Sequence, residues 1–211
     1  MINYNCHNLT QLKEKISSSN YTFDKTKEYK IPRGIITASG TVDRLRDSYV
    51  SIKMLRDTGC RLPIELFYAD EKEITKSQRG IFNELNVNCI NIRSHCPFEA
   101  YNGRNFSIKA IAVYLSMFKE LIWMDSDVIP LVNFEKLFNN QQYINYGYFF
   151  NNDLWSFKKL ETVFTDKIQN LIQILKDDEK YTILPGSPEL DSGLFLLNRE
   201  KLPFKFFDIL L

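Results

Sequence analysis

Two carboxylates separated by one residue, Asp125 and Asp127, directly follow the apolar run Leu121–Met124. Ionised carboxylates beside a core cost several kcal/mol unless a cation or hydrogen-bond donors compensate them. Paired carboxylate oxygens suit Mn²⁺ or Mg²⁺ and leave coordination positions for the phosphate oxygens of a nucleotide. In an extended chain both side chains point to the same side, so they are expected to chelate one ion. The pattern predicts a metal-dependent enzyme that acts on a nucleotide-linked substrate, although such a pair can also simply start a turn.

A loop of small and hydroxyl residues, Thr37-Ala38-Ser39-Gly40-Thr41, follows the first predicted strand. Small side chains would let the backbone amides approach a nucleotide, and Thr37, Ala38 and Ser39 are the candidate contacts. The loop carries no Gly-x-Gly-x-x-Gly and no Gly-Lys-Thr, so it supports neither a dinucleotide site nor a P-loop.

Lys109 and a second acidic segment are the remaining candidates for chemistry. Lys109 lies on the predicted helix before the Asp-Ser-Asp motif, where its ammonium could neutralise a diphosphate as a point charge. Without further information a solvated surface lysine is the simpler interpretation. Glu189 and Asp191 precede Ser192-Gly193 and an apolar strand, which suits a catalytic or acceptor-side loop. A turn cap at Asp191 fits the residues equally well.

Size and charge exclude several classes of protein. With 211 residues, 44% of them hydrophobic, the chain can bury one full core. A formal net charge of +1 argues against a general nucleic-acid binder. The four cysteines and two histidines lack the spacing of a structural zinc site. No apolar run reaches about 18 residues, so we expect no membrane span and a cytoplasmic chain with reduced thiols.

Hydrophobic periodicity predicts alternating strands and helices along the chain. The expected elements are a helix at 9–16, a strand at 34–37, a helix at 43–57, a strand at 63–69, a helix at 73–85, a strand at 87–92, a helix at 104–118, a strand from 121, a short helix at 134–138, a strand at 146–150, a helix at 157–175, a polar loop at 186–193 and a strand at 194–197. This order predicts an α/β fold, a mostly parallel sheet flanked by helices, with the Asp pair at the carboxyl end of a central strand. Residues 1–30 are expected to form a separate helix and irregular arm before the domain at 31–211.

The order of these pieces resembles the GT-A fold nucleotide-sugar glycosyltransferases, and among them the yeast-type mannan α-1,2/α-1,3-mannosyltransferases. The resemblance covers residues 33–202, and Trp123–Leu131 followed by Phe134–Phe138 is its most specific segment. The other matching segments are Arg33–Ile36, Ser51–Arg56, Leu62–Tyr68, Lys109, the group Gly147, Phe149, Phe150, Asp153 and Trp155, and the group Glu189, Asp191, Ser192 and Gly193.

This resemblance implies a retaining transfer of mannose from GDP-mannose, with a UDP-sugar possible, to a mannose-containing glycan or glycoprotein. It implies Mn²⁺, or Mg²⁺, bound through Asp125 and Asp127. The candidate catalytic residues are Asp191, Glu189 and Asp127. The candidate donor-binding residues are Thr37, Ala38, Ser39, Lys109, Asp125 and Ser126. Members of this family usually carry a membrane anchor and work in the Golgi, whereas this sequence shows no anchor and is expected to lack the downstream part of the family domain.

Two other functions compete with glycosyl transfer. A sugar-nucleotide-binding or scaffold domain could retain the motif without catalysis. A haloacid-dehalogenase-type phosphatase also has an apolar strand that ends in Asp-x-Asp, but it needs a second Asp pair after a later apolar strand. Here the only candidate for that pair, Asp177-Asp178, lies in the polar run 176–180.

Overall fold

The computed structural model describes residues 29–39, 42–69, 71–94, 107–156 and 188–201. Side chains are described for all of these except residues 42, 107, 152–156 and 188–190. The chain divides into two compact units, Met1–Lys30 and Ile31–Leu211. The predicted helices at 9–16 and 157–175 and the Asp177-Asp178 pair lie outside the described residues.

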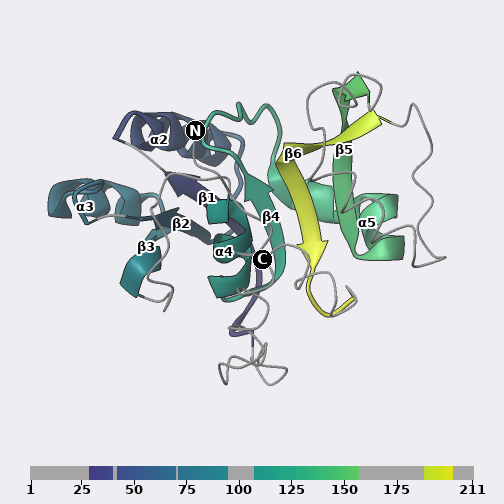
Figure 1. The fold of residues 1–211 in the computed structure, drawn as a ribbon, viewed down its shortest axis with the longest axis horizontal. Coiled ribbons are helices and arrows are strands. Elements are labelled where there is room, and N and C mark those ends of the chain that lie inside the picture. Colours follow the sequence, from purple (N-terminus) through teal and green to yellow (C-terminus); the bar gives the residue numbers. More distant parts are fainter. Residues whose placement is uncertain (1–28, 40–41, 70, 95–106, 157–187, 202–211) are drawn as a thin grey trace, which may run out of the picture. The chain divides into compact units, whose positions relative to one another are not determined.

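Six strands of the described chain form one sheet in the order β3-β2-β1-β4-β6-β5 (Figure 1). The strands are β1 (Ile31–Ser39), β2 (Ile64–Tyr68), β3 (Val87–Asn91), β4 (Phe118–Met124), β5 (Tyr148–Ser156) and β6 (Pro188–Asn198). The helices are α2 (Val42–Asp57), α3 (Lys76–Glu84), α4 (Ser107–Leu115) and α5 (Gln141–Tyr146), with 3-10 turns η1 (Ile92–Ser94) and η2 (Phe134–Asn139). The first four strands pair in parallel, and β6 is antiparallel to both β4 and β5. The predicted fold class is confirmed.

Alternation along the strands gives the sheet two covered faces. Ile35, Ile64 and Ile122 occupy one face, where the core also includes buried residues of α2, α3, η2 and α5. Trp123 and Phe195 are paired across β4 and β6, and their rings stack 6.0 Å apart. Lys109 of α4 lies over the Trp123 ring, which places α4 on this second face. The central strand β4 is therefore enclosed from both sides, as its apolar sequence predicts.

The predicted helix at 104–118 was too long at its carboxyl end. Helix α4 ends at Leu115, and Phe118 already belongs to β4. The hydroxyl of Ser116 accepts a hydrogen bond from the Phe118 amide, and the buried Arg199 guanidinium donates to the carbonyls of Tyr114, Ser116 and Phe118. One of these bonds takes the Tyr114 carbonyl in the last turn of α4, and the others hold the chain just beyond the helix, so the chain turns there instead of continuing the helix.

Two predictions near the carboxyl end of the described chain were also wrong. The loop expected at 186–193 is strand from Pro188 onward, because β6 pairs with β5 there even though its residues are polar. The strand expected to start at Tyr146 starts at Tyr148, after the short helix α5. Gly147 ends that helix in the left-handed conformation, with φ of 79°, which favours glycine. No helix in the described part of the chain is long and apolar enough to cross a bilayer.

Candidate active site

The Asp-Ser-Asp motif forms a turn rather than an extended strand end. Strand β4 stops at Met124, and the Val128 amide donates to the Asp125 carbonyl at 3.1 Å. The expectation that Asp125 and Asp127 share a face in extended geometry was therefore wrong. The turn directs the two carboxylates to different partners, and Ser126 between them is buried.

Asp125 is tightly fixed at the end of β4. Its Oδ1 accepts from the Trp123 indole at 2.7 Å, and its Oδ2 accepts from the Lys109 ammonium at 2.9 Å. Its backbone amide donates to the Gly193 carbonyl at 2.8 Å, which extends the β4–β6 pairing by one residue. An adjacent cation and an N–H donor therefore compensate the charge of this partly buried carboxylate. Such compensation was expected from the sequence, because Asp125 follows an apolar strand.

Lys109 joins the two acidic segments. Besides Asp125, its ammonium donates to the Ser192 carbonyl at 2.9 Å and to the Ser192 hydroxyl at 3.0 Å. The side chain is only 18% exposed and lies 5.4 Å from the centroid of the Trp123 ring. A solvated surface lysine, the simpler interpretation of the sequence, does not describe this residue.

Asp191 borders the same space beside Gly193 as Asp125 does. Its Oδ1 accepts from the Gly193 amide at 2.7 Å. A side chain at Gly193 would begin 3.1 Å from that oxygen and 3.7 Å from Asp125 Oδ2. The absence of a side chain at Gly193 therefore leaves space that both carboxylates border. The Glu189 backbone belongs to β6, and its side chain is outside the described residues, as are those of Asp153 and Trp155.

Asp127 faces α2 and is the exposed member of the motif. Its Oδ2 accepts from Arg44 Nη1 at 2.8 Å, with 61% of the Asp127 side chain and 51% of the Arg44 side chain exposed. Arg44 was not among the residues predicted from the sequence to lie at the site. No spacing rule points to it, because 83 residues separate the two partners.

Two of the three predicted donor-binding residues at the end of β1 have side chains that point into the protein. Thr37 and Ser39 are fully buried, and the Thr37 hydroxyl makes no hydrogen bond with any residue the structure describes. Ala38 between them is partly exposed. A ligand at the end of β1 would meet Ala38 and backbone atoms first, and the donor-binding role of the three residues stays a prediction.

A divalent cation at this motif would need further ligands from a bound substrate. Within the described ranges, no group of three or more His, Cys, Asp or Glu side chains is placed to hold a metal ion. Mg²⁺ and Mn²⁺ need fewer protein ligands when a nucleotide supplies phosphate oxygens, and one or two carboxylates then suffice. Asp125 and Asp127 would supply that number of hard oxygen ligands at the carboxyl end of β4, where open α/β sheets place their ligands, and a metal ion there stays a prediction.

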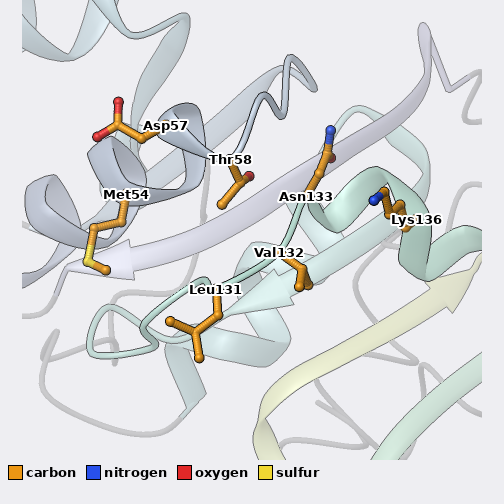
Figure 2. A pocket seen from close by; sticks show the side chains of 7 residues that line it. All are labelled: Met54, Asp57, Thr58, Leu131, Val132, Asn133 and Lys136. Atoms are coloured by element: carbon orange, nitrogen blue, oxygen red, sulfur yellow. The ribbon is translucent and has the colours of Figure 1, made fainter.

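A separate cavity of about 750 Å³ lies between the end of α2 and the chain around η2 (Figure 2). Among described residues, its lining comes from the end of α2 and the residue after it, from the chain just before η2 and from η2 itself, and none of the carboxylates above takes part. The lining residues are Met54, Asp57, Thr58, Leu131, Val132, Asn133 and Lys136. This cavity is therefore separate from the predicted site residues.

Comparison with known proteins identifies the family. Residues 32–207 match the family model described as "Mannosyltransferase putative". The chain belongs to this mannosyltransferase family. It is 32% identical over 138 residues to the alpha-1,2-mannosyltransferase MNN21 of Candida albicans and 29% identical over 127 residues to MNN2 of Saccharomyces cerevisiae. These matches cover 60% and 58% of this chain. The chain spans only about a fifth of the length of these curated relatives, 21% in both cases.

Solved glycosyltransferase structures share the fold of this family member. The galactosyltransferase LgtC, in complex with donor and acceptor sugar analogues, aligns with a TM-score of 0.51 and 13% identity, covering 80% of this chain and 58% of that one. The bifunctional glycosyltransferase WbbM aligns with a TM-score of 0.57 and 9% identity, covering 82% of this chain and 32% of that one. At such low identity these likenesses establish the GT-A fold and nothing finer.

Proposed function

We propose that this chain transfers mannose from GDP-mannose to a mannose-containing glycan, with retention at the anomeric carbon. Membership of the mannosyltransferase family supports the class of reaction. The observation that carries the proposal is the Lys109 ammonium, which binds Asp125 and Ser192 together and so brings both acidic segments to one point at the end of β4. The proposed reaction needs a diphosphate site and a sugar site next to each other, and these two acidic segments would supply them.

We assign each residue a role from its burial and its contacts. Lys109 places a largely buried positive charge where the diphosphate oxygens would gather, and buried charges act more strongly than solvated ones. The Trp123 indole orients Asp125. Asp125 and Asp127 would hold a Mn²⁺ or Mg²⁺ ion, which when bound stabilises the negative charge of the leaving diphosphate as a Lewis acid.

Asp191 is placed to act on the sugar. The Gly193 amide orients its carboxylate, and the space beside Gly193 separates it from Asp125. In the reaction the bond between the anomeric carbon and the diphosphate oxygen breaks, and the diphosphate leaves with the electron pair. The acceptor hydroxyl oxygen then bonds to that carbon from the same face and gives its proton to the departing diphosphate. Asp191 would support the positive charge of the sugar while neither bond is fully formed.

The test is turnover with a panel of nucleotide sugars and Mn²⁺, measured as release of nucleoside diphosphate with and without a mannoside acceptor. We expect GDP release from GDP-mannose that depends on acceptor. Asp127→Asn should lower the rate about a hundredfold or more, the order of magnitude for losing one group that stabilises the transition state.

Asp57→Asn is the matched control, because Asp57 is an exposed, ion-paired aspartate at the far end of α2. It should keep the wild-type rate. Transfer that survives Asp127→Asn would contradict the proposal. Binding of GDP-mannose without any turnover would instead support a non-catalytic sugar-nucleotide-binding domain.

A further inference from the structure

Arg44 sits at the start of α2 and shares one nitrogen between two carboxylates. Its Nη1 lies 2.8 Å from Asp127 Oδ2 and 3.5 Å from Asp47 Oδ2. Asp47 is one helical turn further along α2, so both acceptors are within reach without movement of the backbone. Arg44 can therefore exchange one partner for the other by rotating its side chain.

The two cations that compensate the motif are held very differently. Lys109 is 18% exposed, donates to three oxygen atoms and lies against the Trp123 ring. Arg44 and Asp127 are both more than half exposed. Exposed ion pairs are weak because water competes with them, whereas partly buried, multiply bonded charges are not easily displaced. The structure thus has one fixed cation at Asp125 and one replaceable cation at Asp127.

We propose that Arg44 is an exchangeable counter-ion, which occupies Asp127 in the absence of metal and moves to the diphosphate when the nucleotide and a divalent cation bind. This inference rests on the proposed function, since it takes a metal-bound nucleoside diphosphate as the incoming ligand. A divalent ion on Asp127 would repel a guanidinium 2.8 Å from the same carboxylate. The diphosphate brings acceptor oxygens to that end of α2, and a guanidinium matches phosphate geometry better than an ammonium does.

The proposal predicts effects of opposite sign for one substitution. In Arg44→Gln, Asp127 has no competing cation, so Mn²⁺ measured alone by electron paramagnetic resonance of the free ion should bind about fivefold more tightly. That factor corresponds to about 1 kcal/mol, the upper value for an exposed pair. GDP measured by calorimetry at saturating Mn²⁺ should bind about tenfold more weakly, because a charged hydrogen bond to phosphate is lost.

Arg46→Gln is the matched control. Arg46 lies on the same helix, has a 77% exposed side chain and pairs with Asp43 instead of the motif. The same change of charge at Arg46 should leave both affinities within twofold of wild type. Arg44→Lys retains the charge without the planar fork, so we expect near wild-type Mn²⁺ affinity and weakened GDP binding. Melting temperatures of all three variants establish that they are folded.

The outcomes separate this inference from the proposed function. If Asp125→Asn and Asp127→Asn abolish Mn²⁺ binding while Arg44→Gln matches Arg46→Gln in both measurements, the counter-ion role is refuted and the proposed metal site stands. A loss of both Mn²⁺ and GDP affinity in Arg44→Gln would also refute it, since Arg44 would then only support the site. Wild-type protein that binds neither Mn²⁺ nor GDP would overturn both proposals.

Discussion

Replacing Lys109 by methionine tests the central contact of the site. Methionine keeps an unbranched side chain of similar length, so packing against Trp123 is largely retained. The substitution removes the ammonium and its contacts with Asp125 and Ser192, at 2.9 to 3.0 Å. Of the two side-chain donors to Asp125 named above, the Trp123 indole then remains.

The expected magnitude follows from the burial of this ion pair. A hydrogen bond to a charged group contributes roughly 1.5–3 kcal/mol net. The side chain of Lys109 is 18% exposed and that of Asp125 is 30% exposed, so screening by water reduces the effect only partly. We therefore expect a loss of about 2 kcal/mol in transition-state stabilisation, or about thirtyfold in kcat/KM for GDP-mannose.

The assay compares kcat/KM and the free energy of unfolding for Lys109→Met and Lys53→Met. Lys53 pairs with Asp57 on α2, and both side chains are close to half exposed or more. Its substitution should change activity less than twofold and stability by about 0.5 kcal/mol or less. If Lys109→Met keeps kcat/KM within twofold of wild type, or loses it only in proportion to the fraction unfolded, Lys109 has no role in donor binding.

Two further predictions concern stability. Gly34→Ala should lower the free energy of unfolding in urea by about 2–3 kcal/mol, because its Cβ would meet the Phe118 ring at 2.3 Å, whereas Gly80→Ala, with no heavy atom within 4 Å, should be neutral or stabilising. Burial raises the pKa of Cys89 to about 11 from 9.0. The folded state therefore favours the protonated thiol, and this stability is full below pH 9 and lost as the pH rises towards 11. Because this thiol is only partly buried, screening by water reduces the effect, and the stability difference between wild type and Cys89→Ala should shrink by roughly 1 kcal/mol over that range. A constant difference would contradict the assigned cause.

The strand and helix order was predictable because periodicity reports directly on burial. The buried residues of α2 recur at helical spacing, and β2 is buried throughout, as a central parallel strand should be. The boundaries were less predictable, since tertiary contacts decide them. Apolar Phe118 fits either a helix or a strand, and the Arg199 bonds that hold the chain just after α4 come from a residue more than 80 positions away.

The convergence of three predicted residues follows from the rule that open α/β sheets place their ligands at the carboxyl ends of the strands. Asp125 directly follows β4, Lys109 lies in the first turn of α4 and Asp191 lies within β6, and the structure brings the three together near the carboxyl end of β4. Arg44 could not be predicted, since an arginine in the first turns of an amphipathic helix has no pattern that separates it from a solvated one. Short helix α5 could have been found from its caps, Asn140 and Gly147.

The motif at Asp125 forms the turn that was one of the two interpretations of the sequence, and the metal site stays a prediction. A turn and a metal site are compatible, because a bond from Val128 to the Asp125 carbonyl does not involve the carboxylate oxygens. The turn gives the two acids unequal surroundings: Asp125 is held by a nearly buried lysine, and Asp127 by an exposed arginine. Under the proposed function, this inequality would help the site release its products. The fixed pair would preserve the geometry of the strand end through each cycle, while the weak pair at Asp127 would cost little to break when metal and nucleotide arrive.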